Sequence, residues 1–106
     1  MTGGYAVLWR EGKGSIYAGK VELDPGALRL EGSCHGRRRS FRTIRYEDLA
    51  GVSLTRAPEE RLFGKLTLIL ELREGAAVDI AALNRLGTVR ELEEEIAIRA
   101  TKVPVD

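Results

Sequence analysis

The chain has 106 residues, of which 43% are hydrophobic and 31% are charged, with 17 Lys and Arg against 16 Asp and Glu. This length provides for one domain with a modest core, and the composition is that of a folded protein, which excludes global disorder. No apolar run approaches the roughly 20 residues that a membrane-spanning helix requires.

Neither a signal peptide nor an internal disulfide is expected. The chain begins without the basic and apolar segments of a signal peptide, and a single cysteine, Cys34, cannot pair within the chain. We therefore expect a cytoplasmic protein, or a module of a larger one. The net charge of +1 neither favours nor excludes a nucleic-acid partner.

The first half of the chain is predicted to form short strands joined by turns. The predicted strands run over residues 5–11, 15–23, 27–31, 37–44 and 49–56. Gly19 inside the second strand indicates a bulge or the close approach of another backbone. Residues 32–36 are predicted as a loop, Phe41 as the core anchor of the fourth strand, and Thr55 as an outward-facing residue of the fifth.

The segment from Leu62 to Ala100 is predicted to organise the fold. Leucines at 66, 68, 70 and 72 alternate with other residues, which indicates a strand over 62–72, and Gly75 allows a tight turn into a partner strand over 76–81. Residues 88–101 are predicted to form a helix that opens with a Thr88–Glu91 capping box. Its apolar residues recur every three or four positions and form one stripe: Val89, Leu92, Ile96 and Ala100.

These elements predict a mainly β fold of about seven antiparallel strands followed by one helix. Short strands in succession, with a single helix able to close an open end, favour a partly open barrel or two packed sheets over an α/β layer fold. No repeat and no break in composition divides the chain, so we expect one domain over residues 1–106.

The same pattern resembles the pleckstrin-homology (PH-like) superfold, and most of all its small bacterial members. The resemblance lies in "FRTIRYEDLAGVSL" at 41–54, "KLTLILELREGAAVDIAAL" at 65–83 and "GKGSIYAGKVELDPGALRLEG" at 12–32. It implies a partly open barrel with a C-terminal helix. Eukaryotic lipid-binding PH domains carry a Lys and then Lys/Arg-x-Arg across their first hairpin, whereas Lys13 and Lys20 stand alone here. Phosphoinositide binding of that type is therefore not implied.

The strongest charge feature is a run of arginines in the fourth strand. Arg37, Arg38, Arg39 and Arg42 form this run. Arginine binds phosphates and carboxylates bidentately, so one interpretation is a patch that, together with Lys13, binds an acidic partner or anionic lipid. The other is a strand edge kept basic to prevent edge-to-edge pairing. The run divides between the two faces of the strand, with Phe41 on the face of Arg37 and Arg39.

Other chemical motifs are weak. One Cys and one His, adjacent at 34 and 35, cannot supply the four ligands of a structural zinc site, and adjacent residues seldom form a nucleophile pair. The acids at 91–95 suit the start of a helix, and Gly12-Lys13-Gly14 lacks the spacing of a phosphate loop. Trp9 is expected in the core rather than on a docking surface.

We therefore expect a non-catalytic interaction module with no cofactor and no metal, which binds a protein partner or a second copy of itself. Seven short strands leave an open edge, so an oligomer is plausible. The alternative is a peripheral module that binds anionic membranes through the strand from Arg37 to Arg42. An accessory domain of an enzyme is a third hypothesis. Few aromatic residues lie among the basic ones, which argues against nucleic acid.

Overall fold

The computed structural model describes residues 4–34, 36, 38–55, 62, 65–83 and 88–101. These residues form seven strands, a short 3-10 helix and one α-helix. In chain order they are β1 (Gly4–Glu11), β2 (Tyr17–Leu23), β3 (Ala27–Cys34), β4 (Arg38–Arg45), η1 (Tyr46–Asp48), β5 (Leu49–Leu54), β6 (Thr67–Leu72), β7 (Ala77–Ala82) and α1 (Thr88–Thr101). The predicted fold class, mainly β with a C-terminal helix, is confirmed.

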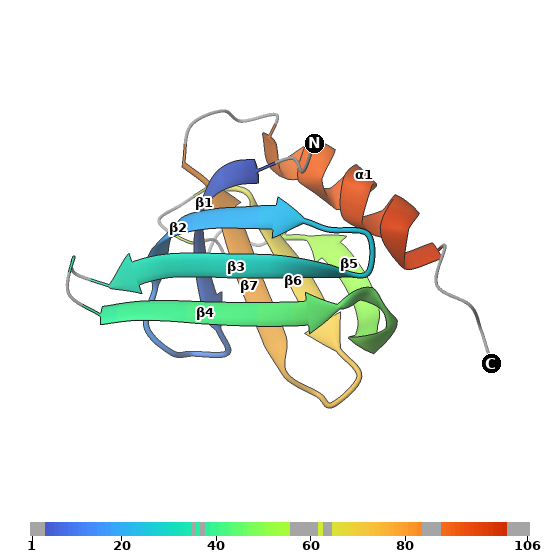
Figure 1. Cartoon of the computed structure of the whole chain (residues 1–106), viewed down its shortest axis with the longest axis horizontal. Helices are drawn as coiled ribbons and strands as arrows, with labels where there is room; N and C mark the ends of the chain where they lie inside the picture. Colours follow the sequence, from blue (N-terminus) through green and yellow to red (C-terminus); the bar gives the residue numbers. More distant parts are fainter. Residues whose placement is uncertain are drawn as a thin grey trace.

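All seven described strands belong to one antiparallel sheet in the order β4-β3-β2-β1-β7-β6-β5. The sheet curls into a half-barrel, so that β2–β4 pass in front of β6 and β7 at a steep angle in Figure 1. β1 joins the two halves because it pairs with β2 on one side and with β7 on the other. β4 and β5 are consequently the two edge strands, although only η1 separates them along the chain.

The concave face of the sheet holds the core, as the alternation of apolar residues predicts. In β1 the buried residues are Val7 and Trp9, and in β7 they are Val78 and Ile80. The leucines predicted to face inward in β6 are also buried: Leu68, Leu70 and Leu72. Gly75 has a φ of 102°, a conformation that suits glycine, and it makes the predicted turn between β6 and β7.

The prediction of a close backbone approach at Gly19 is confirmed. Gly19 pairs directly with Gly32 of β3, and a Cβ at Gly19 would lie 2.0 Å from the carbonyl oxygen of Glu31. A Cβ at Gly32 would lie 3.0 Å from the indole nitrogen of Trp9. The predicted loop at 32–36 is wrong at its start, because β3 continues to Cys34 between β2 and β4.

The connection between β5 and β6 differs from the prediction. β6 begins at Thr67 rather than at 62, since the backbone N–H of Leu62 donates to the Thr67 hydroxyl, which itself donates to the carbonyl of Lys65. Thr55, predicted to face outward, is only 3% exposed, and its hydroxyl accepts from the Thr67 N–H. Residues 56, 63 and 64 of the predicted strands lie outside the described residues.

Helix α1 covers the β5 side of the half-barrel (Figure 1). It packs against β5, β6, β7 and η1. Val89, Leu92 and Ile96 of the predicted stripe are buried, while Ala100 is partly buried against the core. The Glu91 carboxylate lies 3.5 Å from the Tyr5 hydroxyl, which donates to it. Within the described ranges, no helix is long and apolar enough to cross a membrane.

Candidate functional site

Strand β4 carries most of the residues predicted to form a site, and it lies at one edge of the sheet. It pairs along its whole length with β3, from Arg45 opposite Ala27 to Arg38 opposite Cys34. Pairing with β3 decides which way each side chain points, because directly opposed residues share a face. Ile44 lies opposite the buried Leu28 and therefore turns inward.

The prediction that Phe41 anchors the core is wrong. Phe41 lies opposite Glu31 on the outer face and is 69% exposed, whereas Ile44, three residues later, is 2% exposed and fills the core position. The arginines did not decide the arrangement, because Phe41 shares its face with Arg39 while Ile44 shares the other face with Arg38 and Arg42. The sequence therefore offered two large apolar candidates for the core, on opposite faces, and pairing with β3 selected Ile44.

The arginine run is divided by the sheet into residues with different roles. Arg42 is on the inward face, with its side chain 34% exposed, and holds two acids from distant segments. Its Nε atom lies 3.1 Å from Glu11 at the end of β1, and its Nη2 atom donates to Glu74 in the β6–β7 turn over 3.4 Å. The buried Nε–H is not directed at the Glu11 oxygen, so that contact is an ion pair without a hydrogen bond.

Arg38 and Arg39 are exposed, and no carboxylate in the described residues forms an ion pair with either. The Arg39 guanidinium lies over the Phe41 ring, 5.7 Å from its centroid, in a cation–π contact. Lys13 is exposed in the β1–β2 turn. Arg37 and His35 lie outside the described residues, so the structure gives no account of them.

Charges on the neighbouring strands are paired among themselves. Lys20 contacts Glu22 at 2.9 Å and Glu31 at 3.5 Å, and Arg29 contacts Asp24 at 2.7 Å and Glu22 at 3.3 Å. The hydrogen bond between Lys20 and Glu22 lowers the pKa of the Glu22 carboxyl and raises the pKa of the Lys20 ammonium. The unmatched positive charge of this outer surface is therefore carried by β4.

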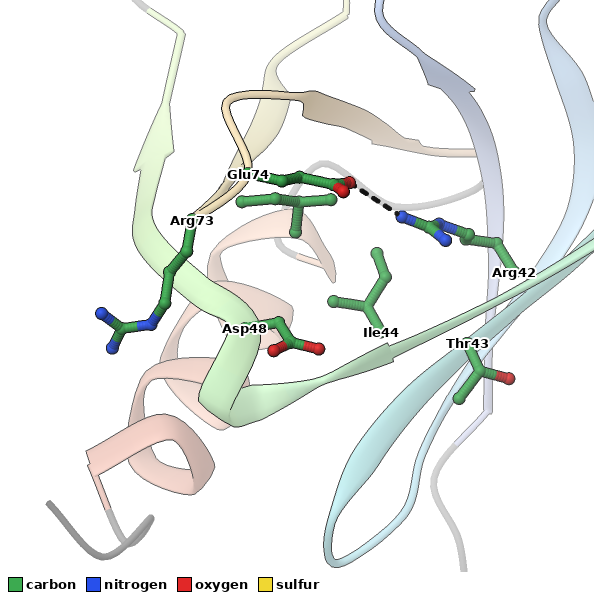
Figure 2. A pocket seen from close by; sticks show the side chains of 7 residues that line it. Arg42, Thr43, Ile44, Asp48, Arg73 and Glu74 are labelled. Atoms are coloured by element: carbon green, nitrogen blue, oxygen red, sulfur yellow. Dashed lines mark hydrogen bonds and ion pairs between the residues drawn. The ribbon is translucent and has the colours of Figure 1, made fainter. Parts of the chain in front are cut away.

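A small cavity of about 250 Å³ lies between β4, η1 and the β6–β7 turn. Its lining consists of Arg42, Thr43, Ile44, Asp48, Leu72, Arg73 and Glu74. Figure 2 shows Arg42 and Glu74 pointing toward each other, while the Arg73 side chain points away from them. Arg73 instead contacts η1, because its Nε donates a hydrogen bond to the carbonyl of Glu47 over 2.7 Å. Arg42, Arg73 and Glu74 beside the cavity are thus engaged in contacts that connect β4, η1 and the β6–β7 turn.

Two buried aromatic residues, Trp9 and Tyr46, have structural roles. Trp9 is 1% exposed, as predicted for a core residue; its indole N–H donates to the carbonyl of Glu31, and its ring stacks on Tyr17. The Tyr46 hydroxyl donates to the carbonyl of Asp24 over 2.8 Å, and burial raises the pKa of Tyr46 to about 12. Among the described residues, no group of three His, Cys, Asp or Glu side chains could hold a metal ion.

No protein-family model matches the chain, and no curated protein matches it in sequence. Solved structures do match in fold. One is the crystal structure of the C-terminal domain of an unknown protein from Leishmania infantum, with a TM-score of 0.72 and 12% identity over 94% of this chain and 83% of that one. Another is a chain of the 8S snRNP assembly intermediate, with a TM-score of 0.72 and 10% identity over 100% of this chain and 84% of that one.

At such low identities these likenesses show the fold alone. The curled seven-stranded half-barrel with its C-terminal helix has the general shape of the PH-like superfold, as the resemblance in sequence implies. Arg38 and Arg39, which were predicted for a site, lie exposed on the same edge strand as the exposed Phe41. Arg42 differs from these arginines because it is paired with Glu11 and Glu74.

Proposed function

We propose that the chain is a non-catalytic binding module of the PH-like superfold and that it binds a protein partner through β4. The observation that carries the proposal is the 69% exposure of Phe41 on the open edge strand, beside arginines without a carboxylate partner in the described residues. Aromatic residues and arginine are the side chains most enriched at the centres of protein interfaces. An exposed Phe in contact with Arg39 fits that chemistry.

A second copy of the chain is the partner that charge disfavours. β4 contains four arginines and no acid, so two β4 strands brought together would repel. Light scattering over a range of concentrations measures this directly. We expect the mass of a monomer, and a stable dimer that is abolished by Phe41→Ala would replace the proposal of a distinct partner with self-association.

Anionic membrane is the alternative, and the exposed Phe41 beside Arg39 is the observation that favours it. Each basic residue near such a surface contributes on the order of 1 kcal/mol. Of the residues predicted for this role, Arg42 is already paired with Glu11 and Glu74, which leaves Arg38, Arg39 and the separate Lys13 among those that the structure describes. Cosedimentation with neutral and anionic vesicles at low and high salt tests it, because lipid binding of this kind is lost at high salt.

A photo-crosslinking amino acid at position 41 tests the proposal itself. The matched control places the same amino acid at Ala97, an exposed position of α1. We expect position 41 to capture one protein in cells of the source organism, position 97 not to capture it, and the purified pair to bind with the same dependence on β4. The change Arg38→Glu with Arg39→Glu should abolish the adduct and leave the melting temperature nearly unchanged. Vesicle binding without any adduct at 41 would contradict a protein partner.

A further inference from the structure

We infer that the partner is an extended acidic segment that pairs with the free edge of β4 as an additional strand. This inference rests on the proposed function and specifies how the partner binds. β4 is the last strand on its side of the sheet, and no described strand pairs with its outer edge. An edge strand presents backbone donors and acceptors that an extended peptide can satisfy.

The hydrogen-bond pattern of the sheet identifies the residues at this edge. Tyr46 N–H donates to the carbonyl of Gly26, at the end of the β3–β4 ladder. Because bonded and non-bonded pairs alternate in an antiparallel ladder, residues 38, 40, 42 and 44 of β4 direct their backbone groups to β3. The β2–β3 turn, where Asp24 N–H donates to Ala27, gives the same alternation. The groups directed to the free edge are therefore those of Arg39, Phe41, Thr43 and Arg45.

The two faces of β4 specify the side chains of the partner. The outer face presents the exposed ring of Phe41 with the Arg39 guanidinium over it, whereas the inward side begins with the exposed Arg38 and continues through Ser40 to Arg42. A strand laid against this edge would place alternate residues beside each set, because successive side chains point to opposite faces. The matching chemistry is a segment that alternates acidic residues, beside Arg38, with apolar residues, beside Phe41.

The arginines also disfavour some registers in which a second copy of β4 could be the added strand. Antiparallel pairing centred on Ser40 would set Arg38 opposite Arg42 of the other copy, and pairing centred on Arg42 would set that residue opposite itself. Like charges directly opposed across a sheet are destabilising. The arginines thus oppose self-pairing in these two registers, whereas pairing centred on Phe41 would set no two arginines of β4 opposite each other. The net positive charge of β4 complements an acidic strand in every register, and a dimer that buries Phe41 against itself would overturn the inference.

The probe for the test is a blocked, fluorescently labelled octapeptide of alternating glutamate and valine. One control peptide replaces glutamate by lysine, and a second keeps every side chain but carries N-methylated valines, which cannot donate backbone hydrogen bonds. We expect the first peptide to bind the full chain at least about tenfold more tightly than either control, a difference of about 1.4 kcal/mol. Fluorescence anisotropy measures the three affinities.

Protein variants distinguish binding at the β4 edge from attraction by the net charge of the protein. Arg38→Glu with Arg39→Glu should weaken binding of the glutamate peptide at least about tenfold. The control, Lys65→Glu with Arg90→Glu, changes the net charge equally at two exposed residues outside β4 and should leave binding nearly unchanged. Equal loss in both variants would mean that net charge alone attracts the peptide, and this result would overturn the inference.

Amide hydrogen exchange followed by NMR reports the strand pairing itself. In the free protein we expect slow exchange at residues 40, 42 and 44 and fast exchange at 39, 41, 43 and 45. The glutamate peptide should slow exchange at the second set and leave the first unchanged. Binding without this alternating protection would overturn strand addition and leave the proposed function standing. No binding of the peptide would also overturn the inference, while the crosslink from position 41 decides the proposed function independently.

Discussion

The two edges of the sheet, β5 and β4, are protected from unwanted pairing in different ways. β5 (LAGVSL) carries no charged residue, is irregular between Leu49 and Gly51, and packs against helix α1. β4 (RRSFRTIR) has a regular register along its whole length, and its protection comes from arginines. An edge can be closed by a bulge and a covering helix, or left open and made basic.

The difference between these edges has a functional consequence. A covered edge is unavailable to any partner until the helix moves, whereas a charged edge is closed only to partners of the wrong charge. Apolar packing stabilises the β5 side, while ion pairs and exposed side chains dominate the β4 side. Changes at the β5 edge should therefore affect folding, and changes at the β4 edge should affect binding.

The largest effect is expected where α1 covers the β5 side. Leu92→Ala or Ile96→Ala removes a fully buried side chain and should lower the free energy of unfolding by about 2–5 kcal/mol. Chemical denaturation measures this change, and Glu94→Ala on the exposed face of α1 is the matched control, expected within about 0.5 kcal/mol. A loss below about 1 kcal/mol for both core variants would mean that α1 does not close the half-barrel.

The next largest effect on stability is expected at Tyr46, the first residue of η1 between β4 and β5. Tyr46→Phe removes the hydrogen bond to the Asp24 carbonyl and should cost about 1 kcal/mol at neutral pH. Burial raises the pKa of Tyr46 from 10.0 to about 12, so the folded state favours the protonated phenol. Its contribution is present below pH 10 and is lost as the pH rises from 10 to about 12.

Denaturation at a series of pH values checks this prediction. The wild-type protein should lose stability between pH 10 and 12, and Tyr46→Phe should lose less over the same range. Tyr5, whose pKa is also raised by partial burial and by Glu91, contributes in the same direction, so the variant keeps part of the slope. Identical slopes for both proteins would contradict the assigned role of Tyr46.

A smaller effect is expected from the ion pairs that hold β4 to the rest of the barrel. Arg42 and Glu74 lie 3.4 Å apart with both side chains partly exposed, so solvent screens their attraction. A double-mutant cycle of Arg42→Gln and Glu74→Gln should give a coupling of about 0.2–1 kcal/mol that falls as salt is added. A coupling that is independent of salt would assign these residues to packing instead.

The smallest effect on stability is expected at the most exposed residue of the β4 edge. Phe41→Ala should change the free energy of unfolding by less than about 0.5 kcal/mol and yet abolish the peptide complex. Ile44→Ala is the matched control on the inward face of the same strand and should cost about 2–5 kcal/mol. A large loss of stability from Phe41→Ala would mean that Phe41 packs in the core, and it would contradict the proposed role of β4 in binding.

The candidate site was only partly predictable from the sequence. The arginine run and its division between two faces follow from the period of a strand, as do the buried positions of β1, β6 and β7. The exposure of Phe41 depends on the pairing of β4 with β3, which sets it opposite Glu31. Arg42 forms ion pairs with Glu11 and Glu74, which lie 31 and 32 positions away along the chain. No local sequence pattern predicts contacts between such distant residues.

The sequence by itself determined the presence of the seven strands, the buried faces of β1, β6 and β7, the tight turn at Gly75 and the apolar stripe of α1, because each follows from the spacing of neighbouring side chains. Tertiary structure alone decided that β1 lies between β2 and β7, that β4 and β5 become the edges, and that Arg38 and Arg39 keep no acidic partner among the described residues. These features depend on which distant segments meet when the sheet curls. The surface through which this chain is proposed to bind is therefore a product of the sheet order.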